Sequence, residues 1–291
     1  MKQDGLNQID KAVVRARFNK ASTTYDAHDF LQREVAKRAL ERLDFVTVDV
    51  QKAIDLGSGT GRCARELSQR YKKAHITHGD LAWSMLDRAR SLAPRWFSRQ
   101  QYVCADVEQL PFKEDCFDLA FSSLSLQWCL RLENAFNEVR RILKPGGLFM
   151  FTTLGPDTLK ELRQAFATVS GSEHVNAFID MHDIGDLLGG SGFADPVMET
   201  EYLTVEYDDV MTLMRDLKGL GAANAALERG RGLLGKAHLK ALIAAYEQHR
   251  RDGKLPATYE VIFGHAWVTA GPVLQSGTEH VFPLQQLRRR R

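Results

Sequence analysis

Residues 53–61 combine an acidic side chain with closely spaced glycines. They read AIDLGSGTG, so Asp55 is followed by Gly57, Gly59 and Gly61. Glycine has no Cβ, which allows the backbone to turn sharply and allows a ligand to lie directly against it. An apolar run that ends in an acid and continues into such a loop favours a binding site for a nucleotide-like cofactor.

Two further acidic residues follow the next two apolar segments. Asp80 lies between Gly79 and Leu81, and Asp106 precedes Val107. A carboxylate at Asp80 is suited to accept hydrogen bonds from both ribose hydroxyls, and one at Asp106 is suited to an adenine amine. The glycine spacing differs from the GxGxxG of dinucleotide-binding proteins, and no GK[ST] sequence indicates a phosphate loop. These residues therefore predict a cofactor with a nucleoside and a charged amino-acid tail.

The elements that must hold these residues alternate between strand and helix. Strands are predicted at 53–56, 74–78, 101–105, 117–122 and 148–153, and helices at 62–70, 83–92 and 133–143. This alternation predicts an α/β fold with a mainly parallel sheet and helices on both faces. Ligands bind such sheets at the carboxyl ends of the strands, which is where the acidic residues fall.

The segments on either side of this core are predicted to be more helical. Helices are expected at 32–43, at 157–169 beginning with Asp157, and at 181–188 ending before Gly189-Gly190, with later strands at 196–207 and 259–270. Lys144-Pro145-Gly146-Gly147 predicts a turn. The expected division is an N-terminal helical cover (1–50), a core (51–206), a helical lid inserted between the last two strands (207–256), the last strand (257–271) and a basic tail (272–291).

The ordered set of Asp55, GSGTG, Asp80, Asp106 and ILKPGG resembles the class I S-adenosylmethionine-dependent methyltransferases. The resemblance implies a Rossmann-like fold with a seven-stranded sheet, and S-adenosyl-L-methionine as the cofactor. It also implies the residues that bind this cofactor: Asp55, Gly57, Ser58, Gly59, Gly61, Asp80, Leu81, Asp106, Val107 and Ser122.

The segment after the fourth predicted strand narrows the methyl acceptor. It reads SSLSLQW, whereas enzymes that methylate adenine amines or glutamine amides carry an NPPY-type sequence there. Cys129 has no neighbouring proline of the kind that accompanies the nucleophile of cytosine C5 methylases. The clustered acids of metal-dependent catechol enzymes are missing, and no cysteine pair has zinc-binding spacing, so we expect no metal. A small-molecule or carrier-bound acceptor remains.

Four longer segments resemble the malonyl-acyl-carrier-protein O-methyltransferases of early biotin synthesis. These are RARFNKASTTYDAHDFLQREVAKRAL near the N-terminus, GDLAWSMLDRAR and FTTLGPDTLKELRQAF in the core, and MRDLKGLGAANA in the lid. The resemblance implies methyl transfer to the free carboxylate of a malonyl thioester. A methyltransferase of another small molecule such as a quinone precursor, a complex I assembly factor that hydroxylates an arginine, and a regulatory module without turnover are the alternatives.

Cationic or hydrogen-bonding side chains would have to hold this carboxylate. Tyr25 lies in the segment expected to fold over the cofactor, and Gln127 and Thr153 lie at strand ends. Arg163 and Arg215 lie on helices beside the predicted lid. We interpret Tyr25 and Gln127 as catalytic, and Thr153, Arg163 and Arg215 as substrate-binding. Tyr25 could instead be a core aromatic, and Arg163 and Arg215 could instead be solvated surface groups.

The charge of the chain limits its partners. A net charge of +2 and a pI of about 8.3 are too mild to indicate nucleic acid. Basic residues of this kind are usually solvated surface, but Arg229, Arg231, Lys236 and Lys240 could instead form a docking patch for an acidic acyl carrier protein. No run of roughly 18 apolar residues indicates a membrane span. We therefore expect a cytoplasmic enzyme with no membrane partner.

Overall fold

The computed structural model describes residues 10–94, 99–169, 178–220 and 236–269. Within these ranges, seven strands form one sheet in the order β3-β2-β1-β4-β5-β7-β6. The five strands β1 to β5 pair in parallel, and β7 pairs antiparallel with both β5 and β6. The predicted Rossmann-like α/β fold is confirmed. No helix in the described ranges is long and apolar enough to cross a membrane.

The first five strands lie close to their predicted positions. Their bounds are Lys52–Leu56 (β1), His75–Asp80 (β2), Gln100–Cys104 (β3), Phe117–Ser123 (β4) and Leu143–Leu154 (β5). Side chains alternate between the two faces along each strand, so one strand serves two cores. Ala53, Leu119 and Phe121 join the core on one face, whereas Ile54 and Ala120 join the core on the other.

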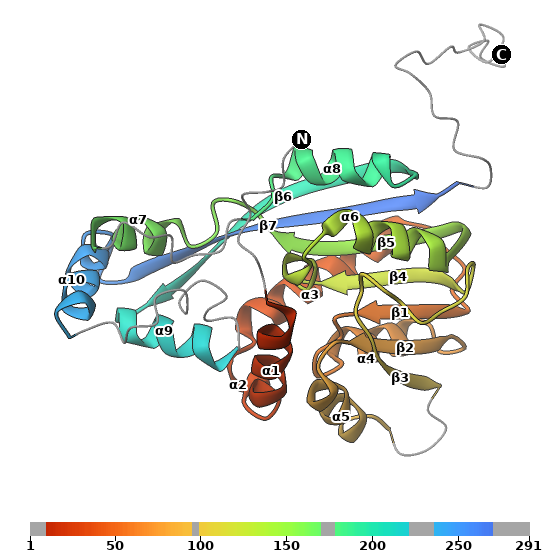
Figure 1. Ribbon diagram of the computed structural model, residues 1–291, viewed down its shortest axis with the longest axis horizontal. Coiled ribbons are helices and arrows are strands. Elements are labelled where there is room, and N and C mark those ends of the chain that lie inside the picture. The colour runs from red at the N-terminus through yellow and green to blue at the C-terminus, as the bar shows by residue number, and fades with distance from the viewer. Residues whose placement is uncertain (1–9, 95–98, 170–177, 221–235, 270–291) are drawn as a thin grey trace, which may run out of the picture.

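Helices cover both faces of this sheet (Figure 1). Helices α3 (Phe30–Arg42) and α4 (Arg62–Arg70) contribute to the core cluster that contains Ala53. Helices α6 (Leu132–Ile142) and α8 (Met181–Gly190) contribute to the cluster that contains Ile54, and α5 (Trp83–Ser91) packs beside β2 and β3. The amphipathic helix predicted at 32–43 therefore forms, beginning two residues earlier and continuing into the short helix η1 (Leu43–Phe45).

Two short N-terminal helices, α1 (Lys11–Ala21) and α2 (Tyr25–His28), lie at the carboxyl ends of the parallel strands (Figure 1). Asp10 caps α1 by accepting hydrogen bonds from the backbone N–H groups of Ala12 and Val13. Helix α1 also packs against α5, where Asn19 accepts a hydrogen bond from the backbone N–H of Ser84. These contacts hold the N-terminal segment against the edge of the sheet at which the sequence places its acidic residues.

The second half of the chain extends the sheet and adds further helices. Helix α7 (Lys160–Val169) follows β5, and the long strands β6 (Phe193–Tyr207) and β7 (Leu255–Val268) form an antiparallel pair. Helices α9 (Val210–Gly219) and α10 (Lys236–Glu247) lie between these strands in sequence. In Figure 1 the β6–β7 pair reaches past the ends of the parallel strands toward α7, α9 and α10.

Three predicted element ends are wrong. Helix α7 begins at Lys160 and not at Asp157, because Leu159 adopts a positive φ of 54° and the Glu260 carboxylate accepts the hydrogen bond from the Asp157 N–H. Lys144–Gly147 lies inside β5, where the pairing with β4 shifts register and Gly146 has a φ of 79°. Helix α8 includes Gly189 and Gly190.

Candidate active site

The glycine loop connects β1 to α4 in a conformation that only glycine adopts readily. Gly57, Gly59 and Gly61 have φ values of 70°, 54° and 82°. The backbone N–H groups of Gly57 and Ser58 both donate to the carbonyl oxygen of Gly79, at 2.8 and 3.0 Å. The loop is therefore fixed to the end of β2, next to Asp80. A side chain at these positive φ values would be strained.

The three glycines differ in what surrounds them. A Cβ on Gly57 would lie 2.2 Å from Cβ of Ser125, and one on Gly61 would lie 2.8 Å from the His78 ring. A Cβ on Gly59 would have no heavy atom within 4 Å. Gly57 and Gly61 thus permit close internal packing, whereas Gly59 leaves open space. That space is part of a cavity, which makes Gly59 the glycine best placed to lie against a ligand.

Asp80 is held by backbone donors at the edge of the same cavity. Its two carboxylate oxygens accept hydrogen bonds from the N–H groups of Gly59, at 2.8 Å, and Ala82, at 2.7 Å. Burial raises the pKa of Asp80 to about 6, although both backbone donors favour the ionised form. Each carboxylate oxygen retains further acceptor capacity, so Asp80 can still accept hydrogen bonds from a diol.

Asp55 points away from the cavity. It is buried, and its carboxylate accepts a hydrogen bond from the backbone N–H of Ala64 in the first turn of α4, at 3.0 Å. Burial raises the pKa of Asp55 to about 7. Ser122 is also buried, and its hydroxyl donates to the carbonyl of Leu56. Asp55, Ser58, Gly61 and Ser122 therefore support the loop from behind and do not line the cavity.

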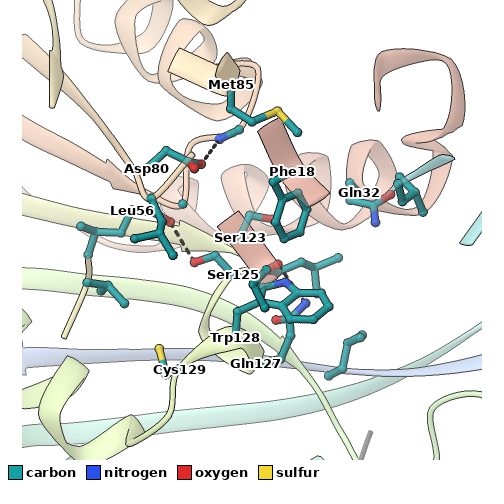
Figure 2. Close-up of a pocket in the computed structure, with 18 of the residues that line it drawn as sticks. Phe18, Gln32, Leu56, Asp80, Met85, Ser123, Ser125, Gln127, Trp128 and Cys129 are labelled. Carbon is teal, nitrogen blue, oxygen red and sulfur yellow. Dashed lines mark hydrogen bonds between the residues drawn. The ribbon is translucent and has the colours of Figure 1, made fainter. Parts of the chain in front are cut away.

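The cavity lies over the carboxyl ends of β1, β2 and β4 and has a volume of about 200 Å³. One end is polar and is formed by Gly57, Gly59, Asp80, Leu81, Asp106 and Val107. The other end is apolar and is formed by Leu31, Leu154, Leu159, Leu162, Leu217, Leu220 and Tyr259. In Figure 2, Asp80 and Leu56 lie on one side, Gln32 lies across from them, and Phe18 and Trp128 lie between.

Asp106 is at the polar end but already has a cationic partner. Its carboxylate lies 2.5 Å from the ammonium group of Lys11, which also contacts Glu108 at 2.9 Å. Burial lowers the pKa of Lys11, but both carboxylates raise it, and the net shift is upward. Lys11 comes from α1, so the N-terminal helix closes this end of the cavity. Lys11 is the cationic side chain of the described cavity lining.

Tyr25 and Gln127 both belong to the cavity lining. Burial, together with the nearby carboxylates of Asp29 and Asp80, raises the pKa of the Tyr25 phenol, which therefore stays protonated. The Gln127 amide nitrogen donates to the carbonyl of Leu124 at 2.9 Å, while its buried amide oxygen has no hydrogen-bond partner. A buried acceptor without a partner is costly, so this oxygen is available to a ligand donor.

Aromatic rings form the wall beside these two residues. Phe18 of α1 and Trp128 meet edge to face, with ring centroids 5.5 Å apart. Tyr25 packs with Phe18 in the same small apolar cluster. The faces of such rings carry partial negative charge and attract a positively charged group, so this wall suits a sulfonium cofactor. The same rings also suit an apolar ligand.

The three residues predicted to bind the substrate lie elsewhere. Thr153 is buried in β5, and Arg163 donates from α7 to the carbonyl of Thr158. Arg215 is exposed on α9, where it donates to the hydroxyl of Thr212. None of the three belongs to the described cavity lining. The structure thus brings Tyr25 and Gln127 to the cavity and leaves the two arginines outside it.

Comparisons with known proteins agree with this arrangement. A family described as a methyltransferase domain matches residues 54–151. The chain is 53% identical over 264 residues to the malonyl-acyl-carrier-protein O-methyltransferase of Methylovorus sp. (strain MP688), with 89% of each chain covered. It is 49% identical over 274 residues to the enzyme of that name from Gallionella capsiferriformans (strain ES-2), with 92% of this chain and 94% of the relative covered.

This chain belongs to the malonyl-acyl-carrier-protein O-methyltransferase family. The fold alone is shared more widely. The crystal structure of the YcgJ protein from Bacillus subtilis superposes with a TM-score of 0.59 at 15% identity, covering 81% of this chain and 100% of that one. The resemblance inferred from the sequence motifs is confirmed.

The sequence patterns do not single out several residues that line the cavity, although Gln32, Leu217 and Leu220 lie in segments that resemble the family. Lys11, Gln32, Leu217, Leu220 and Tyr259 all line the cavity. Lys11 lies on α1 and Gln32 on α3. Leu217 lies on α9, Leu220 directly after it, and Tyr259 on β7, and no local motif connects these elements. Only the N-terminal cover as a whole, predicted to close over the glycine loop, indicates that Lys11 and Gln32 could lie near it.

Proposed function

We propose that this protein transfers a methyl group from S-adenosyl-L-methionine to the free carboxylate of malonyl-acyl carrier protein, an early step of biotin synthesis. The observation that carries the proposal is the single cavity that joins a polar nucleoside end to an apolar end. Identity of 53% to a relative named for this reaction supports it. The methyl acceptor would enter the apolar end and meet the cofactor beside Tyr25 and Gln127.

The residues of the polar end fit S-adenosylmethionine. Gly59 leaves open space for the methionine part, and Asp80 retains acceptor capacity for the ribose hydroxyls. The backbone N–H of Val107 and the carboxylate of Asp106 are the groups that would bind the adenine. Lys11 would then balance the charge of Asp106 from the outer side. When bound, the cofactor supplies an activated methyl group on a positively charged sulfur.

The acceptor needs no general base, because a carboxylic acid with a pKa near 4 is already ionised at neutral pH. The work of the protein is therefore to position one carboxylate oxygen in line with the methyl group. Tyr25, held protonated, and the second N–H of the Gln127 amide nitrogen, whose first N–H donates to Leu124, are the proposed donors to that carboxylate. Neutral donors orient the carboxylate without cancelling its charge, so it remains attracted to the sulfonium.

A transfer assay tests the proposal directly. The protein is incubated with methyl-labelled S-adenosylmethionine and either malonyl- or acetyl-acyl carrier protein, and base-labile methyl ester is measured. We expect label with the malonyl form only, because the acetyl form has no free carboxylate. No label with either carrier would refute the proposal. Malonyl-coenzyme A is tested in parallel, and labelling it with the same efficiency would show that the reaction does not require the carrier protein.

The carrier protein itself requires a docking surface. We propose the basic patch of Arg229, Arg231, Lys236 and Lys240, since acyl carrier proteins are typically acidic and opposite charges speed association. Lys240 is exposed on α10, whereas Arg229, Arg231 and the side chain of Lys236 lie outside the described residues.

Reversing the first three charges together should raise the KM for the malonyl carrier at low salt. The triple variant Lys72→Glu, Lys73→Glu and Lys113→Glu, at exposed positions, changes the net charge by the same amount and is the control. Turnover that is equal in both variants at low salt would contradict the patch.

A further inference from the structure

The four-residue helix α2 contacts the glycine-loop region through its acidic residues. Asp26 accepts a hydrogen bond from the hydroxyl of Thr60 at 2.7 Å, and Asp29, directly after the helix, pairs with Arg62 at 2.6 Å. Thr60 lies in the glycine loop and Arg62 begins α4. Tyr25, the first residue of the helix, lines the cavity. The position of α2 is thus fixed by the cofactor end of the site.

The last residue of α2 contacts the other end of the site. Nδ1 of His28 donates to the carboxylate of Asp216 on α9 at 3.0 Å. The imidazole also lies directly against Gly219, where a Cβ would be only 2.3 Å from Cδ2 of the ring. A hydrogen bond and a close packing contact therefore join α2 to α9 at one point.

Asp216 also lies beside Tyr207, a residue of the sheet. Burial, with Asp216 beside it, raises the pKa of the Tyr207 phenol at the end of β6 to about 12. Burial likewise raises the pKa of Tyr259 on β7, and Tyr207 contributes to that shift. His28, Asp216, Tyr207 and Tyr259 thus form a connected polar group that ends in the cavity lining.

Helix α9 supplies part of the apolar wall. Leu217 and Leu220, together with Leu31 and Tyr259, line the cavity at its apolar end. The same four side chains line a second cavity of about 290 Å³, which also contains His28 and Asp216. These four residues therefore form a partition between the two cavities. Its position depends on where α9 lies relative to α2.

We propose that His28 is a positioning residue for the methyl acceptor: by holding α9 against α2, it sets the apolar wall that the malonyl thioester contacts. This inference rests on the proposed function, because it assigns the apolar end to the acceptor. The side chains of His28 and Asp216 are 31% and 35% exposed. A partly exposed pair contributes little to global stability, so its role in placing the wall can be measured separately.

Replacing the imidazole should weaken acceptor binding and spare cofactor binding. For His28→Ala we expect the KM for malonyl-acyl carrier protein to rise about tenfold, the factor expected for one lost hydrogen bond to a charged group. The dissociation constant for S-adenosylmethionine should change less than about twofold, since Asp26 and Asp29 still fix α2. His28→Asn, which keeps a donor near the Nδ1 position, should restore most of the affinity for the acceptor.

Gly219 offers an internal check on the mechanism. Its φ is not in the left-handed region, so alanine suits the backbone, and the three atoms nearest to the added methyl group all belong to the imidazole of His28. Gly219→Ala alone should raise the KM for the acceptor, because it pushes the ring away. In the background of His28→Ala it should have no further effect. Met211→Ala, an exposed change on the same helix, is the control.

Amide hydrogen exchange of residues 210–219 tests the contact without turnover. We expect faster exchange in His28→Ala and Gly219→Ala than in the wild type and in Met211→Ala. Unchanged exchange in these two variants would overturn the inference. An unchanged KM for the acceptor in these variants, measured where the wild type is active, would also overturn it. Independent, multiplicative effects of the two substitutions would also overturn it. A wild-type protein that does not methylate the malonyl carrier would instead refute the proposed function.

Discussion

The two ends of the cavity are built from the chain in opposite ways. The cofactor end comes largely from one stretch, from Gly57 to Val107, in which each residue follows a neighbouring parallel strand. The acceptor end gathers side chains from Leu31 to Tyr259, carried by helices and by the antiparallel strand β7. The first end is made of backbone and partly buried carboxylates, and the second of side chains on elements packed around the sheet.

This difference between the two ends predicts how each of them responds to amino-acid substitutions. Gly57 and Ser58 are bonded to Gly79, and Gly59 to Asp80, so the loop is over-determined by backbone hydrogen bonds. The apolar end depends on contacts such as His28 with Asp216, which a single substitution can remove. We therefore expect substitutions at the cofactor end to abolish binding and those at the acceptor end to change specificity and KM.

The largest effect should follow the loss of the Asp80 carboxylate. Asp80→Ala removes the acceptor proposed for both ribose hydroxyls and frees the N–H of Gly59 and Ala82. Hydrogen bonds to a charged group are each worth about 1.5–3 kcal/mol, so affinity for S-adenosylmethionine should fall roughly 100-fold or more. Isothermal titration with S-adenosylhomocysteine measures the loss.

Asp87→Asn is the matched control for this substitution, because Asp87 is exposed on the neighbouring helix α5. Its affinity should equal that of the wild type. If Asp80→Ala bound the cofactor normally and lost only affinity for the acceptor, the division of the cavity into two ends would be wrong.

Two alanine substitutions in the glycine loop should separate folding from binding. Gly57→Ala combines a positive φ with a Cβ 2.2 Å from Ser125, so the free energy of unfolding should fall by about 3 kcal/mol. Gly59→Ala meets no atom within 4 Å and should cost only about 1 kcal/mol of strain, but its methyl group would occupy the cavity.

Denaturant unfolding and cofactor titration of the two proteins distinguish these outcomes. We expect Gly57→Ala to be the less stable and Gly59→Ala to be stable but unable to bind tightly. Tight cofactor binding by Gly59→Ala would show that the methionine part does not lie against this residue.

The sequence predicts the cofactor end better than the acceptor end for a physical reason. The positions of Asp80 and Asp106 follow from where their strands stop, because parallel strands bring their carboxyl ends to one edge. The direction of the Asp55 side chain is not fixed by this rule, and the structure turns it toward the N-terminus of α4. The local sequence pattern therefore predicts that a residue lies near the site, but it does not predict the direction of the side chain.

Contacts across long sequence separations could not be predicted in the same way. Lys11 meets Asp106 across 95 residues and His28 meets Asp216 across 188 residues. Such pairs depend on how α1, α2 and α9 pack on a completed sheet, and neither pair has a characteristic spacing. The same limit applies to Arg163 and Arg215, which lie on α7 and α9 but whose side chains lie outside the described cavity lining.

At the acceptor end, Gln127 should matter for turnover and not for stability. Gln127→Met removes a buried oxygen that has no partner together with the hydrogen bond to the carbonyl of Leu124, and these opposing effects should leave the melting temperature nearly unchanged. Loss of a hydrogen bond to the acceptor carboxylate should lower kcat/KM for the malonyl carrier about 30-fold. Cofactor affinity should remain within about twofold of the wild-type value if the two ends act independently.

The smallest expected effect is a pH dependence with opposite signs for stability and binding. Burial raises the pKa of Asp80 from 3.8 to about 6, so this group stabilises the fold below pH 3.8 and loses that contribution as the pH rises through about 6. Cofactor binding favours the ionised carboxylate, so affinity should increase roughly tenfold between pH 5 and 7.5. Asp80→Asn cannot titrate there, and its affinity should be flat over this range.

The raised pKa of Asp55, about 7, supplies an internal comparison because this carboxylate faces α4 and not the cavity. Its titration should lower the stability of the free protein as the pH rises through about 7, without changing cofactor affinity directly. A binding curve measured in Asp80→Asn that still rises through pH 7 would mean that Asp55 senses the cofactor. The glycine loop would then transmit the charge state of Asp55 to the ligand, and the cofactor end would include the buried layer behind it.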